Sequence, residues 1–157
     1  APSMDPNAAP PATDHALARG LQALQAQQPQ QALQLLQAHL RQAPQSIDAW
    51  NAQGLALKRL GRWAQAADSF DHALRLDPNA LEVLVNRAHL HWEQGEAAAC
   101  VALCQRALQR APDMVAAMVN LALALNAQSQ PQAAIAWLRQ AQQLQRSRGG
   151  GELAAAA

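Results

Sequence analysis

The chain has 157 residues, of which 50% are apolar, 15% are charged and 3% are aromatic. Its formal net charge of +1 gives no general attraction to nucleic acid, whose binding needs clustered Lys and Arg side chains. No apolar run approaches the roughly 18 residues that a membrane-spanning helix needs. The composition therefore favours a soluble folded chain and argues against nucleic-acid binding and membrane insertion.

Residues 1–12 hold four prolines and few groups to bury, so they predict a disordered Pro- and Ala-rich lead-in. The start of the chain has neither the basic segment nor the apolar centre of a signal peptide. Because the first residue is not Met, we expect an excised domain or a processed product. The compartment therefore stays unknown.

A 34-residue period organises the chain from Thr13 to Arg146. Pro44, Pro78 and Pro112 each close a predicted helix pair and are evenly spaced (78 − 44 = 34 and 112 − 78 = 34). This spacing divides the array 13–146 into repeats that begin at residues 13, 47, 81 and 115. Their ranges are 13–46, 47–80, 81–114 and 115–148, and each holds a first helix A, a turn and a second helix B.

The second repeat shows the pattern most clearly. Between Asp48 and Pro78 the characteristic residues are Trp50, Gly54, Leu57, Ala66, Phe70, Ala73 and Pro78. Their offsets closely resemble those of the tetratricopeptide repeat family, whose repeat is a pair of helices in 34 residues. The resemblance implies an all-α fold, a right-handed α-solenoid of antiparallel helix pairs.

Small residues at fixed repeat positions are expected to let helices A and B cross closely. In helix A they are Gly20, Gly54, Ala88 and Ala122, and in helix B they are Ala32, Ala66, Cys100 and Ala134. Larger side chains are expected to fill the seam beside them at Leu36, Phe70, Cys104 and Leu138. Helix starts are predicted at the capping residues Thr13, Ser46, Asn79 and Asp113, first turns at Pro29 and Pro131, and turns at Gly61 and Gly95.

The end of the chain departs from the repeat. The segment Ser147–Gly151, SRGGG, is predicted to break the last helix and to begin a flexible Gly-rich tail over residues 147–157. Four residues before it would then stay partly exposed, namely Trp137, Leu138, Ala141 and Leu144. Either another chain covers them or the segment Glu152–Ala157 folds back, unless the tail is simply frayed.

The candidate chemistry is sparse. Cys100 and Cys104 lie four residues apart and resemble half of a metal site, with His89 and His91 near in sequence. Because both cysteines occupy seam positions, we interpret them as buried thiols, and His91 as a packing residue. Reduced thiols favour a cytoplasmic over a periplasmic setting slightly. We predict no active site, metal or cofactor, and hence no enzyme.

The A helices of such an array line a groove, and two asparagines are expected to lie in it at the same repeat position. Asn86 and Asn120 share the sixth repeat position, where an amide can bind the backbone of a peptide. They resemble two rungs of the asparagine ladder of O-GlcNAc transferases, while Ala18 and Ala52 hold the other two places. The predicted groove residues are Asn51, Leu55, Val85, Asn86, His89, Trp92, Val119, Asn120 and Leu123, although some could instead pack between A helices.

These features predict a protein–protein interaction module that binds an extended or short helical peptide of a partner. Ala-, Leu- and Gln-rich repeats suggest a bacterial assembly or scaffold factor. One alternative is a scaffold that self-associates through its last helix or its tail. Another is the substrate-binding arm of a larger enzyme such as a glycosyltransferase.

Overall fold

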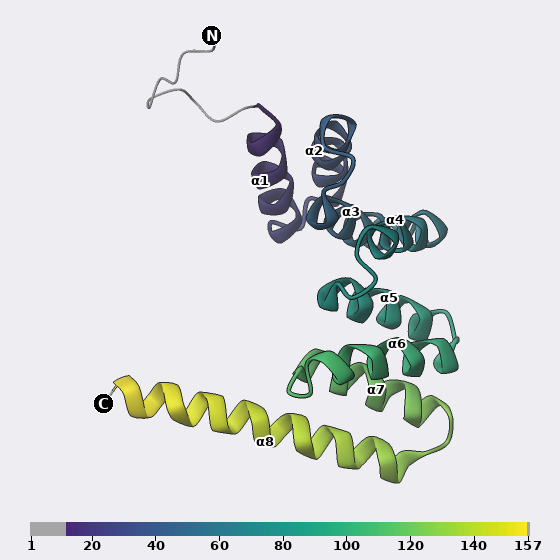
Figure 1. Ribbon diagram of the computed structural model, residues 1–157, viewed down its shortest axis with the longest axis vertical. Helices are drawn as coiled ribbons and strands as arrows, with labels where there is room; N and C mark the ends of the chain where they lie inside the picture. Colours follow the sequence, from purple (N-terminus) through teal and green to yellow (C-terminus); the bar gives the residue numbers. More distant parts are fainter. Residues whose placement is uncertain (1–11, 157) are drawn as a thin grey trace. The chain divides into compact units, whose positions relative to one another are not determined.

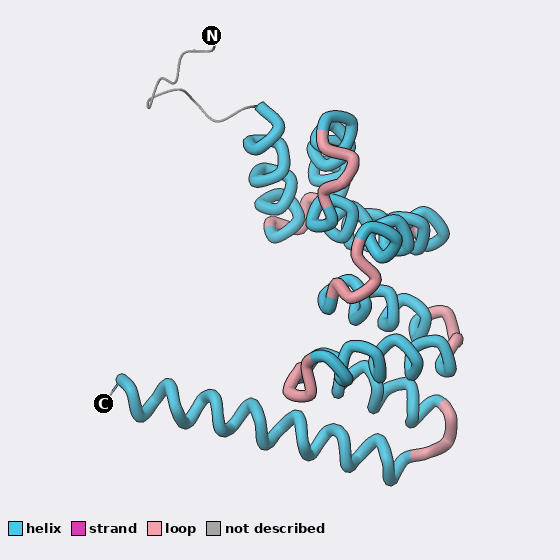
Figure 2. Tube along the Cα trace, in the orientation of Figure 1, coloured by secondary structure: helices cyan, strands magenta, loops and turns pink. Residues whose placement is uncertain are grey.

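A computed structural model describes the backbone of residues 12–156 and the side chains of residues 15–149. Nearly all of the expected lead-in, residues 1–11, lies outside the described residues. Across the described part the helices are joined by short turns and there is no strand, which confirms the all-α prediction (Figures 1 and 2). The helices are α1 (Ala12–Gln25), α2 (Pro29–Gln42), α3 (Ile47–Arg59), α4 (Trp63–Leu76), α5 (Leu81–Glu93), α6 (Ala97–Arg110), α7 (Val115–Ala127) and α8 (Pro131–Ala156).

The helices form two compact units, Ala1–Leu76 with α1 to α4 and Asp77–Ala157 with α5 to α8. In the first unit α1 packs on α2, α3 packs on α4, and α3 also contacts α1 and α2. The second unit repeats this scheme, because α5 pairs with α6, α7 pairs with α8, and α7 contacts both α5 and α6. Each unit is therefore two helix pairs, in which the first helix of the second pair packs mainly on the second helix of the first pair and also contacts its first helix.

The helix starts agree with the capping prediction at one place. Ser46 precedes α3, and its hydroxyl accepts the backbone N–H of Ala49 at 3.3 Å. The predictions for Asn79 and Asp113 are wrong, because Ala80 and Met114 immediately precede α5 and α7 and supply no side-chain cap. The Thr13 prediction is also wrong, since α1 already begins at Ala12. Pro29 and Pro131 open α2 and α8 as expected.

The turn inside each helix pair needs one left-handed residue. Gly61 and Gly95 have φ of +75° and +79°, and Gln27 and Ser129 at the same repeat position have φ of 58° and 62°. Glycine adopts this conformation without the clash between Cβ and backbone that other residues meet. The turn geometry is therefore common to all four pairs, although only two of them carry the favoured residue.

Exchanging the residues at this position should shift stability in opposite directions. Gly95→Ala should lower the free energy of unfolding by about 1 kcal/mol, because the new Cβ meets no neighbour within 4 Å and only backbone strain remains. Ser129→Gly should raise it by up to about 1 kcal/mol. Urea unfolding of both variants measures this, and equal shifts of the same sign would contradict it.

Side-chain volumes are balanced where helices A and B cross. A Cβ on Gly54 would lie 2.5 to 2.8 Å from three ring atoms of Phe70, and one on Gly20 would lie 3.0 Å from Leu36. In the third pair the helix A residue is Ala88 and its partner is the smaller Cys104, both fully buried. In these three pairs a large helix B residue is thus matched with glycine, and a small one with alanine.

Gly54→Ala should therefore destabilise the first unit by about 1 to 3 kcal/mol through overpacking against Phe70. Adding Phe70→Leu should recover part of this loss, because the smaller side chain leaves room for the new methyl group. A double-mutant cycle by chemical denaturation should give a coupling energy of about 0.5 to 3 kcal/mol. Strict additivity of the two changes would show that the two sites do not share this space.

The predicted helix break at Ser147–Gly151 is wrong, because α8 continues through these residues to Ala156. Glycine weakens a helix by about 1 kcal/mol per residue but keeps its N–H, so the hydrogen-bond ladder persists. Arg148 supports the extension by donating from one Nη to the Asp113 carbonyl oxygen at 3.0 Å and to its carboxylate at 3.2 Å. None of the described helices is long and apolar enough to cross a membrane.

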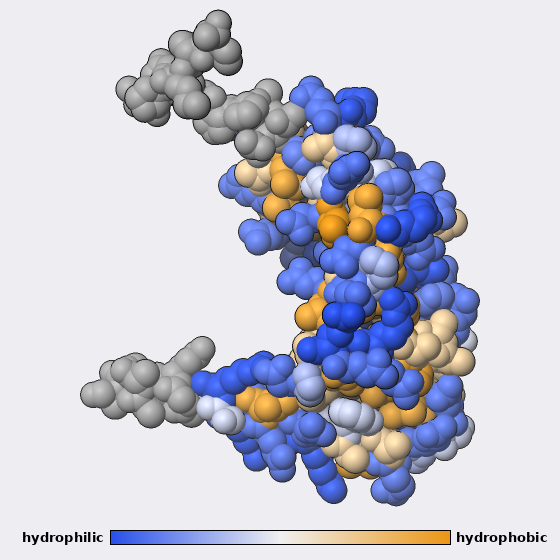
Figure 3. Space-filling view, viewed as in Figure 1, coloured by the Kyte–Doolittle hydropathy of each residue, from blue (hydrophilic) through white to orange (hydrophobic). Residues whose placement is uncertain are grey.

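The partial exposure expected near the end of the array is confirmed for Leu138, which is 45% exposed, but not for Ala141, which is 3% exposed. Leu138 was also expected to fill the seam as Phe70 does, and that expectation is wrong. Ile135, one turn earlier on α8, is 41% exposed. The molecular surface seen in Figure 3 is otherwise mostly hydrophilic, with apolar side chains showing in places, α8 among them.

Candidate functional site on α5 and α7

The predicted groove residues fall on both units. Asn51 and Leu55 lie on α3 and are half-buried, whereas the other seven lie on α5 and α7 of the second unit. The two helices of the second unit are in contact. Only there do the described contacts bring several predicted site residues together.

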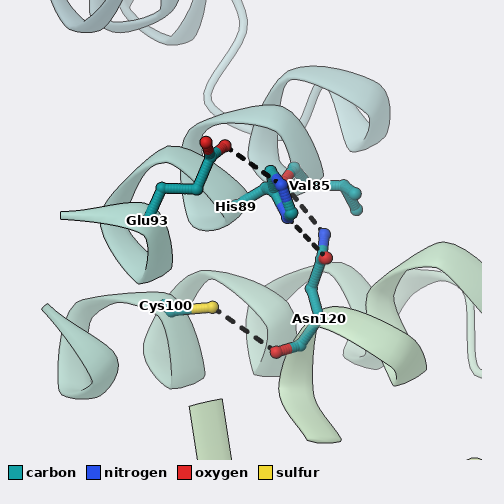
Figure 4. Close-up of polar contacts among 5 residues, drawn as sticks. All are labelled: Val85, His89, Glu93, Cys100 and Asn120. Carbon is teal, nitrogen blue, oxygen red and sulfur yellow. Dashed lines mark hydrogen bonds and ion pairs between the residues drawn. The ribbon is translucent and has the colours of Figure 1, made fainter. Parts of the chain in front are cut away.

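A chain of polar contacts joins α5 to α7 (Figure 4). The Asn120 side-chain Nδ2 donates to the backbone carbonyl of Val85 at 3.3 Å. Its Oδ1 lies 3.1 Å from Nδ1 of His89, and Nε2 of His89 lies 3.0 Å from Oε1 of Glu93. The network therefore runs from the α5 backbone through α7 and back to two side chains of α5.

This network holds the His89 ring in one orientation. Because the Val85 carbonyl can only accept, it orients the Asn120 amide so that the amide oxygen faces His89. Both ring nitrogens of His89 lie within hydrogen-bonding distance of an oxygen atom, Nδ1 on the Asn120 side and Nε2 on the Glu93 side. The ring is therefore fixed between a residue of α7 and a residue of its own helix.

Asn120 is consequently a structural residue and not an open rung of a ladder. Its side chain is 8% exposed, and both of its polar atoms are engaged within the protein. Its backbone oxygen also accepts a hydrogen bond from the Cys100 thiol at 3.6 Å. The expectation that this amide is available to a peptide is therefore wrong, while the role of Asn86 stays a prediction.

The accessible part of the site is aromatic and aliphatic. The rings of Trp92 and His89 have centroids 5.3 Å apart and are tilted by 38°. Trp92, Val119 and Leu123 are half-buried, so each keeps some surface exposed. Val85 is only 7% exposed and belongs to the core instead of the groove. Sequence reasoning did not pair His89 with Glu93, although a spacing of i to i+4 on one helix is the signal for it.

The two cysteines lie beneath this site and are fully buried, as the sequence interpretation expected. The hydrogen bond with Cys100, together with burial, raises the pKa of the Cys104 thiol far above its usual range. A thiol held protonated is a poor nucleophile and a poor metal ligand. Among the described residues, no three His, Cys, Asp or Glu side chains are grouped to hold a metal ion.

On α3 of the first unit, Trp50 and Arg59 act as internal hydrogen-bond donors. The Trp50 indole N–H donates to the Pro44 carbonyl at 2.8 Å, and its ring stacks on His72 at 4.0 Å. Arg59 donates to the Leu24 carbonyl at 2.6 Å, near the end of α1. These donors satisfy carbonyl groups near helix ends, so they hold adjacent helices together.

Comparisons with known proteins address the family directly. One tetratricopeptide repeat model matches residues 47–80, and a second matches residues 85–150. The chain belongs to the tetratricopeptide repeat family. Its fold is the all-α solenoid of that family, and its repeats are a scaffold for protein–protein interaction. No curated protein sequence matches it.

Solved structures of tetratricopeptide repeat architecture are similar to this chain. PilF of Pseudomonas aeruginosa is 25% identical with a TM-score of 0.81, and the match covers 86% of this chain and 62% of PilF. A crystal structure of MamA is 16% identical with a TM-score of 0.78, covering 93% and 83% of the two chains. MamA of Desulfovibrio magneticus RS-1 is 21% identical with a TM-score of 0.75, covering 87% and 77%. At these identities the MamA structures establish the fold alone.

The structural role of Asn120 in this repeat scaffold can be measured. Asn120→Ala should lower the free energy of unfolding by about 1 to 3 kcal/mol, because it leaves the Val85 carbonyl and the His89 ring without their partner. Asn126→Ala, at an exposed position of the same helix, should stay within about 0.5 kcal/mol of the native chain. Denaturation curves for the pair decide the matter, and equal effects would remove the structural role.

Proposed function

We propose that the second unit binds a peptide segment of a protein partner on the face that α5 and α7 share. The observation that carries this proposal is the half-buried Trp92, whose ring lies tilted beside a His89 that Glu93 and Asn120 hold in place. Tryptophan is enriched among the residues that dominate binding energy at protein interfaces. Val119 and Leu123 of α7 are also partly exposed and add apolar surface.

In this proposal the apolar side chains of a peptide contact Trp92, Val119 and Leu123. The Glu93–His89 pair stays at the edge, where its side chains are 22% and 33% exposed and can meet polar groups of the peptide. Asn86 supplies a contact to the peptide backbone, whereas Asn120 supports the site from below. Ordering an extended peptide offsets part of the binding energy, so an affinity of about 1 μM is a reasonable scale.

Asn51 and Leu55 are candidates for a separate contact on the first unit. Both are half-buried on α3, the helix that corresponds to α7 in the other unit. The broader role that we infer is that of an assembly or scaffold factor in a bacterial cell. Membership of the repeat family and the fold shared with PilF and MamA support an interaction role of this kind.

Capture from a cell lysate, followed by peptide mapping of the captured protein, tests the proposal. The native chain is compared with Trp92→Ala and with Leu123→Glu, which removes apolar surface and adds a charge. We expect the mapped peptide to bind each variant at least tenfold more weakly, measured by calorimetry, because both changes remove contacts at the centre of the site.

The matched control is Ala102→Glu, which adds the same charge at an exposed position of α6. It should bind the peptide as the native chain does. Circular dichroism of all variants shows whether the helices are intact. Native affinity in both Trp92→Ala and Leu123→Glu would place the binding site elsewhere on the scaffold.

A further inference from the structure

The last described helix presents an apolar face that the rest of its unit does not cover. We call Ile135 and Leu138, which are 41% and 45% exposed, the α8 face. One 34-residue repeat earlier, the equivalent residues are Val101 and Cys104 on α6. Cys104 is fully buried, and both residues belong to the cluster that includes Leu121 of α7. The α8 face therefore corresponds to the α6 surface that α7 covers.

The repeat itself does not supply a cover. The end of α6 at Arg110 corresponds to Leu144, since 110 + 34 = 144, but α8 passes through this residue and continues to Ala156. At a rise of about 1.5 Å per residue, the continuation carries the chain about 18 Å past the place where the next repeat would turn back. Within the described residues, the turn and next helix that the repeat would place after Leu144 are replaced by this continuation of α8.

We propose that the α8 face binds an amphipathic helix of a different protein, one that carries acidic residues beside its apolar stripe. Between residues 131 and 149 the sequence of α8 has three arginines and neither Asp nor Glu. Arg148 pairs with Asp113, whereas Arg139 and Arg146 lie seven residues apart on one side of the helix and are exposed. Arg139 is one turn from Ile135. An acidic helix seated on the apolar residues would meet this charge.

The two ends of a second copy fit this surface poorly. Three repeats separate α1 from α7, so His15, Arg19 and Gln22 correspond to Ala117, Leu121 and Ala124. The three α1 residues are polar and exposed, whereas the three α7 residues are buried. The face of α1 that would have to replace α7 is therefore polar. Pairing α8 with α8 would bring arginines of like charge together, which disfavours that arrangement.

The test uses a fluorescent helical peptide as the probe. It keeps Leu121, Ala124 and Leu125 of α7 at their own spacing and carries Glu at the flanking positions, and a matched peptide carries Lys at the same places. Fluorescence anisotropy with the full chain measures both affinities. We expect the acidic peptide to bind at least tenfold more tightly than the basic one, with an affinity that falls as salt is added.

Two neutral variants locate the binding. Leu138→Gln should weaken the acidic peptide at least tenfold, and Leu21→Gln, at a leucine that is 37% exposed on α1, should leave it unchanged. Circular dichroism confirms that both variants fold. No binding, equal affinity of the two peptides, or native affinity in Leu138→Gln would overturn the proposal. So would a dimer in sedimentation that Leu138→Gln dissociates, because the occupant would then be a second copy.

This surface is separate from the α5 and α7 site, and its test does not depend on the proposed peptide binding. Trp92→Ala should leave the affinity of the acidic helical peptide unchanged, since Trp92 lies on α5 and is not one of the exposed residues of the α8 face. Loss of binding in that variant would mean that the probe occupies the α5 and α7 site, which also contradicts the proposal.

Discussion

The constraint on which the structure depends is the fixed space between the two helices of each pair. Gly54 lies where any Cβ would collide with the Phe70 ring, and Ala88 is tolerated because its partner is only Cys104. In these pairs the residue that helix A can carry at the crossing therefore depends on the size of its partner in helix B. A large residue in one helix is accommodated by a small one in the other, which lets one architecture recur through different sequences.

Because the packing is local, positions beside the crossing are free to take different chemistry. Gln53 donates a buried hydrogen bond to the Ser69 hydroxyl at 3.0 Å in the first unit. Two repeats later, Leu121 and Trp137 hold the same positions and pack in the apolar cluster around Cys100 and Cys104. A polar pair and an apolar pair thus serve the same structural purpose, provided that the polar pair is fully hydrogen-bonded.

The 34-residue period was sufficient to predict the helix pairs, the turns at Gly61 and Gly95, and the buried cysteines. These features follow from the size of each side chain at its repeat position and from the backbone conformation of the turn. Other features depend on contacts between distant residues. The repeat position of Asn120 predicts a groove residue, but only the structure reveals that the Val85 carbonyl, 35 residues away, accepts a hydrogen bond from its amide. The course of α8 was also missed, since three glycines weaken a helix without removing any of its hydrogen bonds.

The first and last described helices differ in the residues that they expose where a neighbouring repeat would pack. A helix at the end of a repeat array loses one neighbour, and the residues that would have touched it must either become polar or stay apolar. On α1 they are polar, with His15, Arg19 and Gln22 exposed to solvent. On α8 they are Ile135 and Leu138, which are exposed yet apolar. Exposed apolar residues side by side on one helix are unfavourable in water unless they are covered, so Ile135 and Leu138 mark the surface of α8 on which we propose that a partner helix packs.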